Sequence, residues 1–229
     1  MQIHNEKRSF VLLKLIKLKR ILYRLIFLVS VLRYKCYREL ITLKLNKRYP
    51  VVDLGANTGQ SSIILWFRGF EVYAYEPHPI AFEKLNTLFK DVKMIHTINA
   101  AVVESESCEN EEKKLYLHED RDNIDIDLSQ ASSLMIDKTN IDNNDYYRIK
   151  TLKLNKIIED LEKISLVKCD IEGYEYILYK DLLFNKDKIE YFIIETHSKK
   201  NPQWKHKDIE LKKAFSKYLS KDRYNLNWH

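Results

Sequence analysis

A run of two β-branched residues, an acid and a glycine-rich turn constrains the fold of this chain more than any other feature. Val51 and Val52 lead into Asp53, and two of the chain's only four glycines, Gly55 and Gly59, follow closely. Glycine lacks the Cβ that would hold a ligand away from the backbone, so N–H groups in such a strand-to-helix turn approach a ligand closely. The pattern predicts an α/β domain that binds a nucleoside-containing ligand.

A second acid, Glu76, ends the β-rich run 71–75 and lies 23 residues after Asp53. Nucleoside-binding sites in α/β proteins combine two features. A glycine turn follows one strand, and an acid that accepts hydrogen bonds from the ribose hydroxyls follows the next strand. The G-x-G-x-x-G spacing is absent, and Asp53 would repel a pyrophosphate over the turn. The pattern therefore favours S-adenosylmethionine, with its sulfonium, over NAD. The alternatives are a plain strand–helix turn and, for Glu76, an acid placed at a helix N-terminus.

From residue 49 onward, strands and helices alternate, which predicts an α/β domain over 49–229. We expect a mainly parallel sheet flanked by helices, with a ligand crevice at the carboxyl ends of the strands. The predicted strands are 51–54, 70–75, 92–97, 100–103, 114–118, 165–170, 189–195 and 224–228. The predicted helices are 59–68, 79–89, 174–183 and 205–219, and 151–161 is a strand end followed by a helix. Residues 119–147, rich in Asp, Asn and Ser, predict a polar loop over the site.

Residues 1–48 form a basic helical extension with 13 Lys or Arg against two Glu, whereas 49–229 carry 26 against 31 acids. The stretch 7–46 contains no Gly or Pro and predicts one or two helices. Its longest uncharged apolar core, 25–32, is far shorter than the ~20 residues that span a bilayer. We expect amphipathic helices that pack on the domain or a partner, or that bind peripherally to an anionic membrane. Nucleic-acid contact is less favoured.

The cysteines Cys36, Cys108 and Cys169 are scattered, without a C-x-x-C spacing. This set argues against a disulfide framework or a structural zinc site and suits a reducing compartment. Because no small-residue cleavage site follows the first apolar run, a secretory signal peptide is not expected. The sequence therefore predicts a cytoplasmic protein, at the membrane periphery if the basic helices bind lipid.

An acidic block at 167–175 ends one predicted strand, and Glu195 and His197 end the next. Within the block, Asp170 and Glu172 share a side of the strand. If the two strands are neighbours, these four side chains converge at one rim, where clustered acids raise a pKa or hold a proton-accepting histidine. The alternative for His197 is a surface histidine. The same groups suit Mg²⁺ or Mn²⁺, but a site without metal is favoured.

Five segments together resemble the FkbM family of S-adenosylmethionine-dependent methyltransferases over about residues 50–198. They are 51–59, Glu76-Pro77, the Gln-Ala-Ser-Ser-Leu run 130–134, 167–175 and 193–197. The resemblance implies a Rossmann-like class I methyltransferase fold and methyl transfer, typically to a hydroxyl of a sugar or natural product. The chain departs from the family in its short region after His197, where a full antiparallel terminal hairpin is hard to fit.

The patterns and the resemblance together assign roles to individual residues. Those expected at the cofactor are Asp53, Gly55, Ala56, Asn57, Gly59, Glu76, Asn99 and Ser132. Those expected at the substrate are Ser133, Glu175 and Glu195. Catalysis is assigned to His197, Asp170 and Glu172, with His197 or an acid of the block as general base.

The expected acceptor is a small molecule or a glycan, including a lipid-linked sugar. One alternative is an RNA methyltransferase that grips phosphates with the basic extension. It is weaker because the domain is net acidic and lacks an aromatic and basic RNA-binding pattern. The other is a non-catalytic binding protein on the same fold, against which the intact glycine turn and acidic block argue.

Overall fold

The computed structural model describes residues 2–107, 112–120 and 131–228, and of residues 2–16 it describes the backbone alone. Its centre is a six-stranded sheet with the order β10-β9-β8-β1-β2-β3, in which every neighbouring pair is parallel. The strands are β1 (Val51–Leu54), β2 (Val72–Tyr75), β3 (Ile95–Ile98), β8 (Ile164–Cys169), β9 (Ile189–Ile194) and β10 (Tyr224–Asn225). The predicted Rossmann-like α/β class is confirmed.

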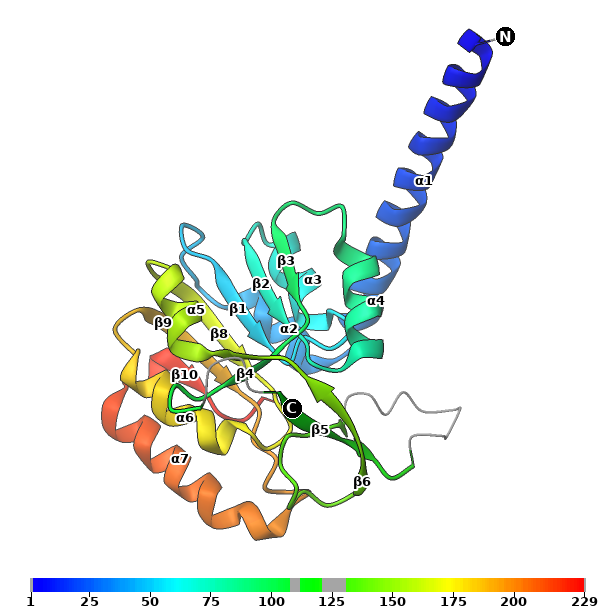
Figure 1. The fold of residues 1–229 in the computed structure, drawn as a ribbon. Helices are drawn as coiled ribbons and strands as arrows, with labels where there is room; N and C mark the ends of the chain where they lie inside the picture. Colours follow the sequence, from blue (N-terminus) through cyan, green and yellow to red (C-terminus); the bar gives the residue numbers. More distant parts are fainter. Residues whose placement is uncertain (1, 108–111, 121–130, 229) are drawn as a thin grey trace.

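Helices cover both faces of this sheet (Figure 1). One layer contains α1 (Gln2–Val31), α2 (Lys35–Thr42), α3 (Gln60–Phe67) and α4 (Pro79–Phe89). The other contains α5 (Leu154–Asp160), α6 (Glu175–Phe184) and α7 (Lys205–Tyr218). Two short 3₁₀ turns, η2 (Pro202–Trp204) and η3 (Lys221–Arg223), flank α7 in the chain.

Successive side chains along each strand lie on opposite faces of the sheet and therefore pack into two separate cores. Val51 and Leu166 pack with α3 and α4, whereas their chain neighbours Val52 and Val167 pack with α5, α6 and α7. Every residue of β1 and β8 is buried, as expected for parallel strands covered on both faces. The continuous apolar runs of the sequence therefore lie at the centre of the sheet.

The prediction of a loop over 119–147 is wrong from residue 141 onward. There β6 (Ile141–Ile149) pairs antiparallel with β5 (Lys113–His118). Cross-strand packing outweighs the polar composition, because Tyr146 lies opposite Tyr116 and Ile149 joins a small core with Leu115. The predicted strands near 100–103 and 114–118 are confirmed as β4 (Ala101–Val103) and β5, and β4 pairs with β7 (Thr151–Lys153). Residues 121–130 of the predicted loop lie outside the described residues.

The C-terminal strand is shorter than predicted and parallel to its neighbour. Only Tyr224 and Asn225 pair with β9, and α7 provides the crossover that makes this pairing parallel. Leu226 and Trp228, which the sequence placed in the strand, are buried in the two cores instead. Among the described residues, no antiparallel strand joins the six-stranded sheet.

The basic extension divides into two parts. Figure 1 shows α1 projecting beyond the domain, and its C-terminal part is fixed to the domain through Arg24, which donates to Leu88 O of α4. In contrast, α2 belongs to the domain core: Leu40 is fully buried, and Arg68 of the α3 C-cap donates to the carbonyls of Leu40 and Leu43. No helix in the described part of the chain is long and apolar enough to cross a membrane.

Replacement of Leu40 by Ala should therefore destabilise the whole domain. A buried Leu→Ala change costs about 2–5 kcal/mol, because the removed atoms leave a cavity. The neighbouring Ile41 is 46% exposed, so Ile41→Ala should change stability by only about 0.5 kcal/mol. Urea unfolding of the two variants measures the difference. Equal losses would contradict the packing of α2 in the core.

Candidate functional site

The glycine turn lies where the sheet order reverses, between β1 and β8, which is the position of ligand crevices in open α/β sheets. Gly55 N and Ala56 N both donate to Tyr75 O at 3.0 Å, which ties the turn to the end of β2. Gly55 has φ +74°, and a Cβ there would lie 1.8 Å from the carbonyl oxygen of Asp170. Glycine is required because the turn packs directly on the backbone that follows β8.

Glu76 is buried at the end of β2 with both carboxylate oxygens oriented by backbone donors. Its Oε2 accepts from Asn57 N at 2.8 Å and its Oε1 from His78 N at 2.7 Å. Burial raises the pKa of Glu76 to about 7, against the lowering effect of these hydrogen bonds. Asn99 braces the same turn by donating from Nδ2 to Glu76 O at 2.8 Å. A carboxylate can accept about four hydrogen bonds, so Glu76 keeps capacity for hydroxyl donors.

A cleft runs along this turn and past the ends of β8 and β9. Of the residues assigned from the sequence, it is lined by Gly55, Ala56, Asn57, Glu76, Ser132, Ser133, Asp170, Glu172 and Glu195. Asp53, Gly59, Asn99, Glu175 and His197 do not line it. Asn57 Oδ1 is buried there without a hydrogen-bond partner. Since a buried acceptor is costly to leave unpaired, this atom fits a ligand that carries an N–H or O–H donor.

Asp53 lies beneath the turn rather than in the cleft. It is fully buried, its Oδ2 accepts from Ser62 Oγ at 2.7 Å, and its Oδ1 lies 3.4 Å from Lys168 Nζ. Lys168 Nζ also donates to Gly55 O at 2.9 Å and pairs with Asp170 Oδ2 at 3.2 Å. Burial alone would lower the pKa of Lys168, but Asp170 and Asp53 raise it, so the ammonium stays charged.

Sequence reasoning did not assign a role to Lys168, although it lies in the quoted acidic block. A lysine inside an apolar strand is rarely buried unless it is paired. Lys168 lies between Val167 and Cys169 and close to several acids in the sequence. That rule could therefore have identified it as a buried lysine paired with acids.

The structure brings His197 together with Asp170, Glu172 and Glu195 at the rim, as the strand-end argument expected, and Glu175 joins them. His197 Nδ1 lies 2.9 Å from Oε1 of the fully buried Glu175. Its Nε2 lies 3.5 Å from Glu172 Oε2, 3.6 Å from Asp170 Oδ1 and 3.9 Å from Glu195 Oε1. The histidine is therefore the centre around which the acids of β8 and β9 are arranged.

These contacts fix the charges in the cluster. Burial would lower the pKa of His197, but Glu175 and Glu172 raise it to about 11. Burial would raise the pKa of Glu172, yet His197 and Lys138 hold it down at about 2. In contrast, burial and the charge of Asp170 raise the pKa of Glu195 to about 7. At neutral pH the cluster thus contains an imidazolium, an ionised Glu172 and a Glu195 near its midpoint.

Segment 131–140 closes the site from the side of β5. Ser133 is buried; its backbone pairs with Tyr116, and its Oγ donates to Glu172 O at 2.6 Å. Lys138 Nζ reaches Glu172 Oε2 at 2.6 Å. Glu172 itself has a left-handed φ of +55°, a strained conformation that these contacts hold in place. Gln130 of the quoted Gln-Ala-Ser-Ser-Leu run lies outside the described residues.

Tyr37 of α2 also lines the cleft, beside Lys168 and Glu195. Its ring packs edge-on against Trp228, with the centroids 5.8 Å apart. Burial raises the pKa of Tyr37, so its hydroxyl remains protonated. No local signal in the basic extension marks this residue, because only tertiary packing places it at the site.

Three side chains of the cluster have ligand atoms within 4.8 Å of one another: Asp170, Glu172 and His197. These three residues are among those that the sequence suggested as ligands of Mg²⁺ or Mn²⁺. Lys168 and Lys138 already pair with two of its carboxylates. Protein cations therefore balance the negative charge that a metal ion would otherwise neutralise.

The sheet is parallel, a glycine turn follows β1 at the point where the strand order reverses, and an acid follows β2. Together these features define a Rossmann-like methyltransferase architecture. The family model of the Methyltransferase FkbM domain matches residues 53–221, and the chain belongs to this family. The protein is therefore a methyltransferase, as the motifs indicated. No curated protein matches the chain.

Replacing Gly55 by Ala should disrupt the turn more than the same change at Gly69. Both glycines have a positive φ, +74° and +89°, but a Cβ at Gly69 meets nothing within 4 Å. The left-handed backbone costs about 1–2 kcal/mol in either variant. The contact with Asp170 should add about 2 kcal/mol or more in Gly55→Ala. Thermal or urea unfolding compares them, and equal destabilisation would contradict the close approach of the turn to β8.

Proposed function

We propose that the protein transfers a methyl group from S-adenosylmethionine to a hydroxyl of a sugar, glycan, glycolipid or related natural product. The proposal rests on one observation: a single cleft has one wall with the features of a nucleoside-binding site and another wall that is acidic. The first wall contains the glycine turn and Glu76, and the second contains Asp170 and Glu195. Donor and acceptor bound there would share one space, which is what direct group transfer requires.

The first wall suits the adenosyl group and its cationic end. Glu76 is oriented by two backbone donors and would accept the ribose hydroxyls. The unpartnered Asn57 Oδ1 would accept a hydrogen bond from the same ligand. The ionised carboxylate of Glu76 lines this wall and favours a ligand with sulfonium and ammonium groups. When bound, S-adenosylmethionine supplies an electrophilic methyl group.

The second wall suits a hydroxyl acceptor that needs a base. A sugar hydroxyl is a poor nucleophile and gains from a carboxylate that takes its proton during the transfer. Glu195 lines the cleft, and a pKa of about 7 makes it a stronger base than an ordinary carboxylate while it stays substantially ionised at neutral pH. We therefore assign the proton-accepting role to Glu195.

His197 has a different role in this proposal from the one expected from the sequence. An imidazolium with a pKa of about 11 has no lone pair with which to accept a proton at neutral pH. Its charge instead holds the Asp170, Glu172 and Glu195 side chains at the ends of their strands. His197 is thus a positioning residue that does not line the cleft.

Cofactor affinity should depend on pH through Glu76. The ionised carboxylate accepts ribose hydroxyls, whereas the protonated form loses acceptor capacity, so affinity should rise as pH increases through the pKa of about 7. With only the ionised form competent, the Kd at about pH 6 should be roughly tenfold weaker than at about pH 8. Calorimetric titration with S-adenosylmethionine measures this dependence.

Glu76→Gln should bind more weakly and lose the pH dependence. Glu71→Gln is the matched control, because Glu71 is exposed and directly precedes β2, whereas Glu76 directly follows it. A Glu76→Gln variant with the same pH dependence as the native protein would assign the titration to another group.

The acceptor class is tested by incubating the full chain with S-adenosylmethionine carrying a radiolabelled methyl group and with separated glycan, lipid and RNA fractions. We expect label in a glycan or glycolipid fraction. Glu195→Gln should lower that labelling by about 100-fold or more while it retains cofactor binding. Glu190→Gln on β9, the strand that Glu195 follows, lies outside the cleft lining and should label normally. Label confined to RNA would overturn the proposed acceptor, and full activity of Glu195→Gln would overturn its assignment as base.

A further inference from the structure

An apolar stripe on α1 is exposed to solvent. Its six aliphatic side chains are each between 47% and 62% exposed: Leu18, Ile21, Leu22, Leu25, Ile26 and Val29. Their spacings of three and four residues place them on one side of the helix, within an arc of about 140° at 100° per residue. We call these six residues the α1 stripe. Single exposed aliphatic side chains are ordinary on protein surfaces, but a contiguous row marks an interaction surface.

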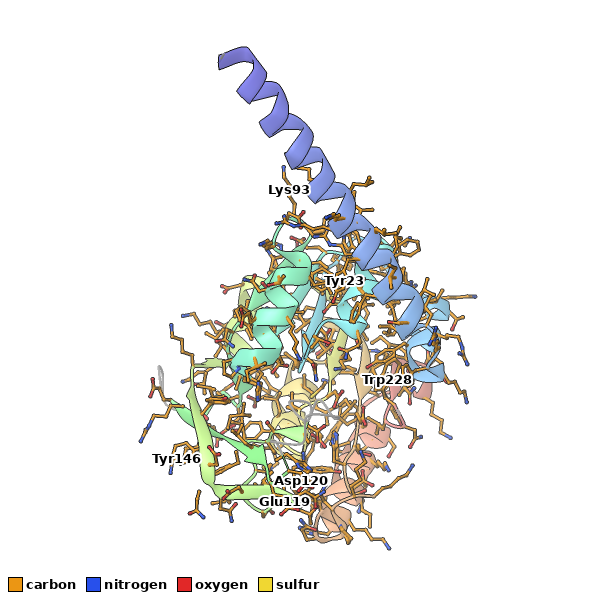
Figure 2. The ribbon with its side chains drawn as sticks, turned by 90° about the vertical axis from the view of Figure 1, so that its right-hand side faces the viewer. Tyr23, Lys93, Glu119, Asp120, Tyr146 and Trp228 are labelled. Carbon is orange, nitrogen blue, oxygen red and sulfur yellow. The ribbon has the colours of Figure 1, made fainter. Side chains whose placement is uncertain are left out.

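The α1 stripe faces away from the domain because the other side of the helix is fixed to it. Leu28 and Val31 are buried in the core under α3 and α4. The buried Arg24 donates from Nε to Leu88 O at 2.7 Å and pairs with Asp91. Figures 1 and 2 show the N-terminal part of α1 extending beyond the domain. The helix is therefore held in one orientation that presents the stripe outward.

Positive charge surrounds the stripe. Lys17 and Lys19 are exposed and lie on either side of it along the helix surface. Residues 1–48 carry 13 Lys or Arg against two Glu, whereas the rest of the chain is net negative. The apolar row and the excess of cations thus occur on the same segment.

We infer that α1 docks this protein on the surface of an anionic lipid bilayer, with the α1 stripe in the acyl–headgroup boundary and the basic residues at the headgroups. An aliphatic row flanked by lysines is the pattern of helices that lie in the membrane interface, where long basic side chains extend to the phosphates. The helix lies on the bilayer rather than crossing it, since no described helix is apolar enough to span one.

Two other occupants fit the surface less well. A second copy packed on the stripe would bring two strongly basic segments together, and like charges repel. An RNA would pair with the lysines, but it would leave the six aliphatic side chains in water. A lipid surface contacts both kinds of group at once. The inference is independent of the acceptor proposed above, because it uses no residue of the cleft.

The test is co-sedimentation of the full chain with phosphatidylcholine vesicles, with and without about 30% phosphatidylserine. We expect binding to the anionic vesicles that weakens as salt is raised, because salt screens the charge attraction. Two triple variants are then compared, each replacing three exposed apolar residues by Gln. The stripe variant is Leu18→Gln/Leu22→Gln/Val29→Gln, and the control is Ile136→Gln/Phe184→Gln/Ile209→Gln. All six positions are exposed, so both variants should fold.

The stripe variant should bind anionic vesicles about tenfold more weakly or worse, since it loses three inserted side chains. The control variant should bind like the native chain. Native protein that stays in solution, or a stripe variant that binds as well as the control, would overturn the inference. A light-scattering mass that shows dimers lost only in the stripe variant, without vesicle binding, would assign the stripe to a second copy instead. Retention on RNA without vesicle binding would assign the segment to RNA.

Discussion

A single buried ammonium, Lys168 Nζ, holds the site together. It lies 3.4 Å from Asp53 Oδ1 and 3.2 Å from Asp170 Oδ2, and it donates to Gly55 O at 2.9 Å. These contacts join the end of β1, the glycine turn and the end of β8, which are the elements on either side of the point where the strand order reverses. A buried charge is tolerated only when it is paired and hydrogen-bonded, so removal of the Lys168 ammonium would leave the fully buried Asp53 without a compensating charge. The conformation of the turn and the placement of the acidic wall therefore depend on the same interaction.

A second buried cation organises the opposite wall. The imidazolium of His197 lies against Glu175 and draws the acids of β8 and β9 to one rim. The carboxylates have different properties: His197 and Lys138 lower the pKa of Glu172, whereas burial and Asp170 raise the pKa of Glu195 to about 7. Such divergence between neighbouring titratable groups is typical of catalytic sites. In our proposal it separates the base from the residues that position it.

Segments from before and after the matched family domain meet beside the cleft. Tyr37 precedes the segment matched by the family model, Trp228 follows it, and their rings pack together. Tyr37 lies on α2, which begins four residues after the last residue of α1. A helix docked on lipid would therefore be connected through a short turn to a wall of the cleft.

The sequence by itself determined the fold class, the glycine turn and the acids at the strand ends, because each depends on local pattern. Buried parallel strands require apolar runs such as 164–169, and the close approach at Gly55 requires glycine. Only the tertiary structure decided which groups are charged and which face the cleft. Asp53 and His197, both assigned from motifs, do not line it, while Tyr37 enters from α2. β6 likewise forms only because β5 is beside it. The reason is physical: burial, pKa and cross-strand pairing depend on neighbours that are distant in the chain.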